Sequence, residues 1–230
     1  MSRQPVLRAA LAAAVLGLAT GARAQVPPSA DEARAYRGLH AAAQKGDVQA
    51  IAGASAAALQ ARDARGRTPL HVAAFARQRE AIRALAAAGA DLNALEDDRY
   101  DAVTIAAVAD DEATLRLLLQ LGASAKQVTS RYDGTALIAA AHLGHDGVVR
   151  QLIAAGAPLD HVNNLHWTAL IESIVLGNGG PRHQATLQAL LRAGASQTLT
   201  DRQGNTPLQL ARQRGFSEMV RMLEAAAARR

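Results

Sequence analysis

The residues whose types and spacing could most directly do chemistry lie in a glycine-rich segment, Gly177 to Gln184, which reads GNGGPRHQ. The run ATLQALL follows it at 185–191. A glycine-rich loop that enters a helix can bind phosphate, because free N–H groups of the first turn attract an anion. The segment lacks both the G-x-x-x-x-G-K-S/T and the G-x-G-x-x-G patterns, and no strand is expected before it. We therefore expect a structural or partner-contacting loop, with Asn178, Arg182 and His183 as its polar residues.

Several histidines are candidates for metal ligands. His142 and His145 lie three positions apart, and His161, His166 and His183 follow. A metal site needs ligands that converge on one point and a second layer of hydrogen bonds that orients them. The spacing of these residues does not require such convergence, so we predict neither a metal nor a cofactor. A small-molecule or metal site built from His142, His145 and the glycine-rich segment is kept as an alternative.

Carboxylates are paired in two stretches, Glu96–Asp101 and Asp110–Glu112. General acid–base chemistry needs a sheltered cleft that separates the pKa values of two such groups. These stretches are expected at a hairpin tip and at a helix–helix turn, where solvated faces are the usual outcome. The chain has no cysteine, and Ser55, Ser173 and Ser196 lack the G-x-S-x-G context of a nucleophile. We therefore predict that the protein is not an enzyme.

The elements that position these residues are expected to be helices. The chain has 230 residues, of which 50% are hydrophobic but only 3% are aromatic, and alanine and leucine dominate. This length suits one compact domain or one short array of repeats. The composition favours close-packed helices over a sandwich or barrel.

One sequence pattern recurs along the chain at a nearly constant spacing. Thr68-Pro69-Leu70 is followed by Asp101-Ala102-Val103 after 33 residues, by Thr135-Ala136-Leu137 after 34, by Thr168-Ala169-Leu170 after 33 and by Thr206-Pro207-Leu208 after 38. A second landmark recurs in step with it, at Gly89, Gly122, Gly156 and Gly194. A repeat of this length indicates stacked supersecondary units. The longer last interval places an insertion at the glycine-rich segment, between the two helices of one unit.

The chain resembles ankyrin repeats, whose period of about 33 residues carries the signature T-P-L-H-x-A. Thr68–Ala73 matches this signature in full, and Thr206–Ala211 departs from it only at the histidine. The middle copies are looser, with aspartate for threonine in one and alanine for proline in three. The resemblance extends over about Leu39 to Ala226 and implies an all-α solenoid of stacked helix–turn–helix units with short β-hairpin tips. It also implies structural hydrogen-bonding roles for His71 and His145.

We predict six units, caps included, in a repeat domain that spans residues 39–228. Threonine can cap each first helix, proline fits its first turn, and the recurrent glycine should end each second helix with a positive φ. Within an N-terminal linker at 25–38, the capping box Ser29–Glu32 should open a helix that runs to Lys45. The expected units are 39–62, 63–95, 96–129, 130–162, 163–200 and 201–228.

The resemblance also implies a binding face, because ankyrin proteins bind partners through their hairpin tips and inner-helix surface. Four aromatic residues fall in columns of this surface, and aromatic and arginine side chains are typical anchors of binding hot spots. The alternative is that these rings pack locally between neighbouring hairpins. The predicted partner-binding residues are Arg65, Arg67, Phe75, Asp98, Tyr100, Tyr132, His142, Leu165 and Trp167.

Residues 1–24 are expected to be a secretory signal peptide. Arg3 and Arg8 give a basic start, the apolar stretch 9–20 lacks charge, and Ala22-Arg23-Ala24 fits a cleavage site. The alternative, a membrane anchor, is disfavoured because the apolar stretch is short and rich in alanine. Removal of these three arginines from 25 basic residues leaves 22 against 20 acidic ones, a net charge of +2. Such a balance gives no electrostatic case for nucleic acid.

These observations lead to one functional prediction and two alternatives. We predict a monomeric, non-enzymatic scaffold in the bacterial periplasm, which binds a protein partner through its concave face and binds neither nucleic acid nor membrane. The insertion is similar to one found in exported bacterial ankyrin-repeat proteins, some of which are linked to catalase and peroxide defence. An accessory role for an envelope enzyme such as a catalase is therefore the first alternative. Binding of a small molecule or metal is the second.

Overall fold

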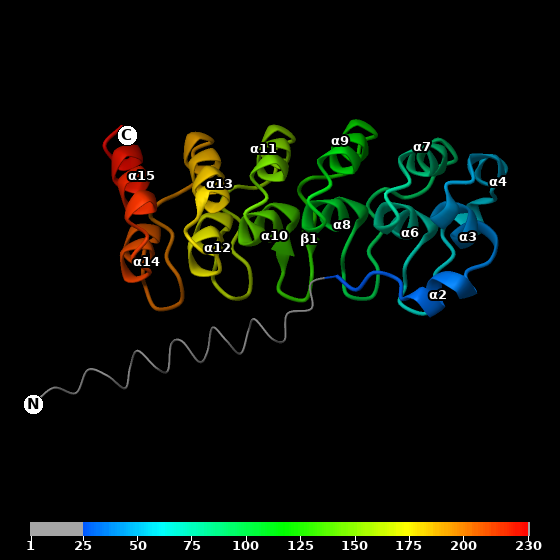
Figure 1. Ribbon diagram of the computed structural model, residues 1–230, viewed down its shortest axis with the longest axis horizontal. Helices are drawn as coiled ribbons and strands as arrows, with labels where there is room; N and C mark the ends of the chain where they lie inside the picture. The colour runs from blue at the N-terminus through cyan, green and yellow to red at the C-terminus, as the bar shows by residue number, and fades with distance from the viewer. Residues whose placement is uncertain (1–24, 230) are drawn as a thin grey trace, which may run out of the picture.

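The protein is an elongated stack of helix pairs (Figure 1), seen in a computed structural model that describes residues 25–229. Its helices are α2 (Ala30–Ala35), α3 (Gly38–Lys45), α4 (Val48–Ala52), α5 (Ala56–Leu59), α6 (Pro69–Phe75), α7 (Arg79–Ala87), α8 (Ala102–Val108), α9 (Glu112–Gln120), α10 (Ala136–Leu143), α11 (Asp146–Ala154), α12 (Ala169–Val175), α13 (Pro181–Arg192), α14 (Pro207–Gln213) and α15 (Ser217–Ala227). The short strands β1 (Val128–Thr129) and β2 (Gly134–Thr135) pair antiparallel.

The helices form two parallel rows, as expected for stacked repeats. An inner row contains α3, α6, α8, α10, α12 and α14, and each of these helices packs on the next. An outer row contains α4, α7, α9, α11, α13 and α15, which also pack in order (Figure 1). Within residues 25–229 this gives six pairs, one for each predicted unit. No unit buries its apolar face alone, so stacking supplies the core.

The inner helices begin where the recurrent sequence pattern predicts. The side chains of Thr135, Thr168 and Thr206 each accept a hydrogen bond from a backbone N–H in the first turn. In the third unit Asp101 takes the place of threonine and accepts the N–H of Thr104 at 2.7 Å. Both residue types satisfy a donor that would otherwise have no partner, which explains why the replacement is tolerated.

The core lies between the two rows and is built from alanine and leucine. Small alanines on the inner helices allow adjacent units to approach closely. The outer helices α7, α9, α11, α13 and α15 each contribute at least one leucine that is 0% exposed, and burial of such a side chain contributes about 2 kcal/mol. These leucines include Leu85, Leu118, Leu152, Leu190 and Leu223, and Ile51 takes this role in α4. The glycines that end α7, α9, α11 and α13 have positive φ, as predicted.

The hairpin tips are tighter than the predicted β-hairpins. One tip contains the strand pair β1–β2, in which Val128 pairs with Thr135. In each of the others, the N–H of the first turn residue donates to the carbonyl four positions later, and its own carbonyl accepts from the N–H three positions later. The first of these bonds joins Asp63 to Arg67, Glu96 to Tyr100, Asn163 to Trp167 and Asp201 to Asn205.

The N-terminal helix differs from its prediction. The capping box between Ser29 and Glu32 is present, but α2 ends at Ala35 and a new helix, α3, begins at Gly38. The break lies at Tyr36, whose backbone is extended at ψ 141°. Its ring stacks on His40 and its hydroxyl donates to Asp63, so contacts with the first hairpin turn the segment away from a continuous helix.

The insertion lies between α12 and α13, as predicted, but only part of it is a loop. Pro181–Gln184 form the first turn of α13, which has 12 residues against 9 in α7, α9 and α11. Proline at the first helical position favours this extension, because it has no N–H to leave unpaired. The predicted signal peptide, by contrast, lies outside the described residues. Within 25–229, no helix has the length and hydrophobicity needed to cross a membrane.

Candidate partner-binding site

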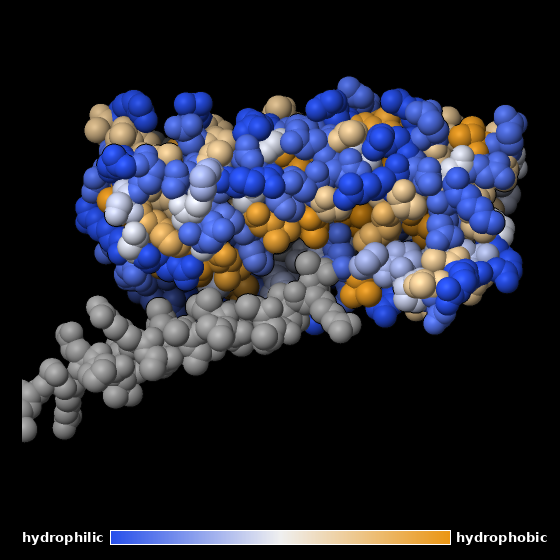
Figure 2. Space-filling model, viewed as in Figure 1, coloured by the Kyte–Doolittle hydropathy of each residue, from blue (hydrophilic) through white to orange (hydrophobic). Residues whose placement is uncertain are grey.

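A cavity of about 110 Å³ lies where the hairpin of the fourth unit meets the inner helices α8, α10 and α12. The hairpin supplies one wall, the three helices supply another, and Tyr100 and Asn163 come from the neighbouring turns. Figure 2 shows apolar surface over α10 and β1, with hydrophilic residues around it. The lining residues are Tyr100, Thr104, Val108, Thr129, Ser130, Arg131, Tyr132, Gly134, Thr135, Ile138, Ala139, His142, Leu143, Asn163 and Glu172.

Three of the predicted binding residues meet at this cavity. Tyr100 comes from the third unit, Tyr132 and His142 come from the fourth, and each is half-buried. Beside them, Leu143 at the end of α10 is 37% exposed, whereas most leucines of the described residues are buried or half-buried. The repeat thus gathers aromatic and apolar side chains at one accessible point on the side formed by the hairpin tips and the inner helices.

Other predicted residues lie outside the cavity. Trp167 and Phe75 are half-buried and pack against the core. Asp98 forms an ion pair with Arg131 at 3.3 Å, beside the cavity. Leu165 is half-buried at the next tip, where its N–H donates to the side chain of Asn163.

Glu172 and Asn163 are two polar residues of the cavity that the sequence pattern did not indicate. Glu172 is 5% exposed on α12, and its Oε1 accepts a hydrogen bond from Asn163 Nδ2 at 3.0 Å. Its Oε2 lies 3.7 Å from His142 Nδ1. A comparison within the repeat register could have found Glu172, because the corresponding positions in the other complete units are apolar. They are Val72, Ile105, Ala139 and Leu210.

Burial controls the protonation of the groups around this cavity. It raises the pKa of Glu172 to about 7, against the opposing effect of the hydrogen bond from Asn163. Burial also lowers the pKa of His142, and the neighbouring His183 and His145 add to this effect. At neutral pH the imidazole of His142 is therefore uncharged, whereas Glu172 is close to its own titration.

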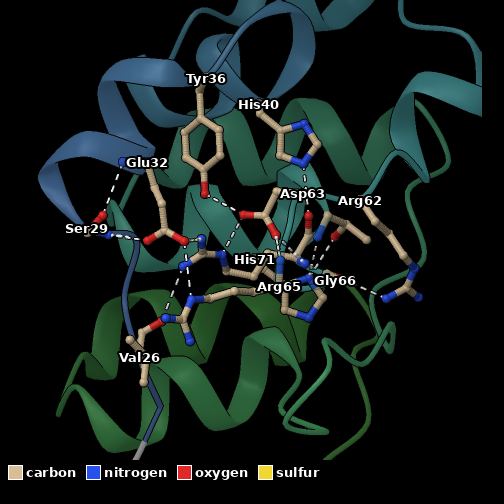
Figure 3. A network of polar contacts seen from close by, with 12 residues as sticks. Val26, Ser29, Glu32, Tyr36, His40, Arg62, Asp63, Arg65, Gly66 and His71 are labelled. Atoms are coloured by element: carbon tan, nitrogen blue, oxygen red, sulfur yellow. Dashed lines mark hydrogen bonds and ion pairs between the residues drawn. The ribbon is translucent and has the colours of Figure 1, made fainter.

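Arg67 does not belong to an accessible binding surface, which corrects its prediction. Its side chain is 1% exposed, and it contacts Val26 and Glu32 of the N-terminal segment, residues 25–37. Arg67 Nε donates to Asp63 at 2.6 Å, and Nη2 donates to Glu32 at 2.9 Å. Figure 3 shows Glu32 and Tyr36 pointing from the N-terminal segment toward this hairpin. The sequence pattern did not reveal these contacts, since the N-terminal segment lies outside the repeat register.

The same network determines the charge of the first hairpin. Burial opposes ionisation of Asp63, but hydrogen bonds from Tyr36, Arg65 and Arg67 lower its pKa to about 2. Arg65, which is exposed, pairs with Glu32 at 3.2 Å. The polar groups of this region therefore satisfy one another and hold the N-terminal segment against the array.

The polar residues of the insertion are also paired within the chain. Arg182 contacts Asp110 at 2.8 Å and Asp146 at 3.3 Å, and so connects three consecutive units. His183 is buried, and its Nε2 donates to the carbonyl of His142 at 2.9 Å. Asn178 Oδ1 accepts the N–H of Gly180. These contacts give the insertion a structural role and leave the Arg182 guanidinium engaged.

The remaining sequence candidates are structural too. His71 Nδ1 accepts from Thr68, and its Nε2 donates to the carbonyl of Tyr100 at 3.1 Å. His145 Nδ1 donates to the carbonyl of Ala107 at 2.9 Å, so both histidines have the expected role. Asp101 and Asp111 are buried helix caps and not the solvated carboxylates that we expected. Within residues 25–229, no three or more His, Cys, Asp or Glu residues are grouped to hold a metal ion.

Comparison with known proteins identifies the repeat. A family model described as ankyrin repeats (3 copies) matches residues 22–96, 39–129 and 103–201. The putative ankyrin repeat protein YahD of Escherichia coli K12 is 37% identical over 190 residues, which cover 81% of this chain and 94% of that protein. An ankyrin repeat domain of Acinetobacter baumannii AYE has a TM-score of 0.76 and 44% identity, and covers 82% of this chain and 97% of its own.

A more distant solved structure has the same architecture. The ankyrin repeat domain of Bcl-3, a member of the IkappaB protein family, has a TM-score of 0.72 and 27% identity. The match covers 84% of this chain and 86% of that domain. Both the extent of the family match and the bacterial relatives lead to one conclusion: this chain belongs to the ankyrin-repeat family.

Proposed function

We propose that this chain is a non-catalytic scaffold that holds a protein partner against the centre of its concave face. Ankyrin repeats generally mediate protein–protein interaction and are typically non-enzymatic. The observation that carries the proposal is the gathering of Tyr100, Tyr132 and His142 around one accessible cavity. Elsewhere, the rings of Trp167 and Phe75 pack against the core.

The stacked array suits such a role because it displays these side chains with little freedom left to lose. Tyr100 is fixed at the end of a turn closed by the bond from Glu96, and its carbonyl accepts from buried His71. Tyr132 lies in the tip between β1 and β2. Binding to a surface ordered in this way avoids much of the entropy cost of association. Tyrosine adds a large contact area with a polar end.

We also propose that the protein acts in the bacterial periplasm. The support for this location is the sequence of residues 1–24, with its basic start, apolar stretch and cleavage pattern. An ankyrin scaffold without cysteine is indifferent to the oxidising conditions of that compartment. The partner would then be an envelope protein, and an enzyme among the captured proteins would identify an accessory role.

The test is affinity capture from a periplasmic extract with the chain that begins at Gln25. The wild type is compared with a Tyr100→Ala, Tyr132→Ala double variant, which removes two rings from the cavity wall. We expect a protein that is retained by the wild type and lost from the variant, as truncation of central aromatic anchors typically costs 2 kcal/mol or more, roughly 30-fold in affinity.

The matched control is a Gln120→Ala, Gln188→Ala double variant, which truncates two exposed side chains of the outer helices. It should capture the same protein as the wild type. Thermal unfolding of all three proteins shows whether the tyrosine variant is folded. If that variant is as stable as the wild type and captures the same proteins, the concave face is not the binding surface.

A further inference from the structure

The cavity contains a carboxyl group, that of Glu172, for which residues 25–229 supply no charged partner at neutral pH. We propose that it receives one cationic side chain, a lysine or arginine of the protein partner, and that Glu172 is the counter-charge. The inference deepens the proposed function and rests on it, because it specifies what chemistry the concave face recognises. It predicts that a partner inserts a single basic residue between Tyr100 and Tyr132.

The geometry of Glu172 leaves one oxygen for such a ligand. Asn163 Nδ2 donates to Oε1 at 3.0 Å. Oε2 accepts no hydrogen bond from residues 25–229 and lies 3.7 Å from His142 Nδ1, beyond hydrogen-bond length. The side chain is 6% exposed, and this residue lines the cavity. A carboxylate held in this way costs free energy unless a cation or a further donor reaches it.

The repeat register shows that a carboxylate is not needed at this position for folding. Three of the other four corresponding residues are Val72, Ile105 and Leu210, which are buried and apolar. An apolar residue here would avoid the cost of burying a charge, so the glutamate is a local exception to the pattern. Such exceptions are expected at functional sites.

Two neighbouring substitutions in the register accommodate this carboxylate. The fourth corresponding residue is Ala139, which lines the cavity and whose small side chain leaves it open. Asn163 occupies the turn position that is acidic in Asp63, Glu96 and Asp201. An acid there would repel Glu172, whereas the amide donates to it. Together the changes build an open, anionic pocket in one unit.

The size of the cavity indicates a side chain and not a small molecule. At about 110 Å³ it is somewhat smaller than the ~150 Å³ cavity that holds benzene, and well below the ~300–1,000 Å³ of ordinary ligand pockets. One guanidinium or ammonium head group fits this space. Tyr100 and Tyr132 line the cavity, and aromatic faces attract a cation at close range.

Other charged groups near the cavity are occupied or uncharged. Arg131 also lines it, but its guanidinium pairs with Asp98 at 3.3 Å. Arg212 on α14, which packs against α12, pairs with Glu224 at 2.6 Å. His142 is uncharged at neutral pH because burial lowers its pKa. Burial raises the pKa of the Tyr100 phenol, so it too is uncharged at neutral pH.

The direct test uses simple cations as probes of the ¹⁵N-labelled chain that begins at Gln25. Ethylguanidinium chloride and n-butylammonium chloride are titrated while amide NMR shifts are followed at Asn163, His142 and Glu172. Ethylurea is the neutral isostere, and potassium chloride controls for ionic strength. We expect saturable shifts with a cation and none with ethylurea. The two cations distinguish an arginine site from a lysine site.

Affinity should rise with pH, because the carboxylate is the binding form. Glu172 loses its proton as the pH rises through about 7. Affinity for the cation is therefore expected to fall about tenfold for each pH unit below that value. We expect clear binding at pH 8 and roughly hundredfold weaker binding at pH 5. Binding that does not change between these pH values would contradict the role of Glu172.

Two variants test the site in different ways. Glu172→Gln removes the charge and keeps the shape, and Ala139→Val fills the cavity with a residue found in the same column at Val72. Each should weaken cation binding at pH 8 by tenfold or more. Glu112→Gln makes the same charge change at an exposed position of α9 and should bind like the wild type. Undiminished binding by folded Glu172→Gln and Ala139→Val proteins would overturn the proposal.

Partner capture separates this inference from the proposed function. If the tyrosine double variant loses the partner but Glu172→Gln and Ala139→Val keep it, the concave face binds a protein without a basic anchor, and this inference fails. If the tyrosine double variant, Glu172→Gln and Ala139→Val all lose the partner, the proposed function and this inference are both supported. If none loses it, the proposed function fails together with the partner assignment, whatever the NMR titration shows.

Discussion

At the scale of the residue, one buried carboxylate makes stability depend on pH. Burial raises the pKa of Glu172 from 4.5 to about 7, so the folded protein holds a proton in a range where the unfolded chain has lost it. Between those values the folded state binds more protons, and stability falls as the pH rises. Above pH 7 the folded protein carries the full cost of the buried charge.

Glu172→Gln should remove this cost and stabilise the protein at high pH. We expect the variant to exceed the wild type in free energy of unfolding by up to ~3 kcal/mol at pH 8, and by less than ~1 kcal/mol at pH 5. Urea denaturation at both pH values measures the difference. Burial lowers the pKa of His71 to about 4, but that effect is common to both proteins and cancels. An equal difference at both pH values would show that Glu172 does not titrate in this range.

At the scale of the element, the insertion is held by close packing at one glycine. A Cβ atom on Gly177 would lie 2.0 Å from the carbonyl oxygen of Ser173 and 2.7 Å from the ring of His183. The first of these is backbone and cannot move without disturbing α12. The ring of His183 also packs against Gly144, which lies between α10 and α11 of the preceding unit. A displacement of this ring would therefore disturb both of those helices.

Gly177→Ala should therefore destabilise the protein by about 1–3 kcal/mol, the usual cost of overpacking. Gly53 gives a matched control, because its φ is −106° and nothing lies within 4 Å of a Cβ added there. Gly53→Ala should change stability by no more than ~0.5 kcal/mol. Urea denaturation of the two variants makes the comparison. Equal effects would mean that the insertion rearranges freely around the new methyl group.

Elements were predictable from the sequence where they follow the repeat, and not where they depart from it. The helix starts at Thr68, Asp101 and Thr206 and the glycine helix ends obey local rules of capping and φ, so the sequence is sufficient to locate them. The break at Tyr36 depends on contacts with Asp63, which is 27 positions away and outside any period.

The candidate site was predicted in part for the same reason. Tyr100, Tyr132 and His142 were found because they occupy columns that the repeat brings to one face. Arg67 occupies such a column as well, but it is buried and contacts a segment outside the repeat. Glu172 was not predicted because its column is interior, whereas binding anchors are expected in exposed columns. A charged residue in an apolar column is the signal that would have revealed it.

At the scale of the whole molecule, each unit is stabilised by its contacts with the neighbouring units of a linear array. The inner helix α10 packs on α8 and α12, whereas the terminal helices α14 and α15 have a neighbouring unit on one side only. In such arrays stability is approximately the sum of unit and interface contributions. Truncation of a core side chain in a central unit weakens its interfaces with two neighbouring units, whereas the same truncation in the last unit weakens only one interface.

Leu137→Ala and Leu223→Ala test this arrangement with the same chemical change. Both leucines are 0% exposed, in α10 and α15 respectively, and such truncations cost about 2–5 kcal/mol. For Leu223→Ala we expect hydrogen exchange to accelerate in α14 and α15 while α8 to α10 keep their protection. For Leu137→Ala we expect protection to fall together in α8, α10 and α12. A uniform loss along the chain in both variants would mean that the array unfolds as one unit, because the coupling between repeats then exceeds the stability of any single repeat.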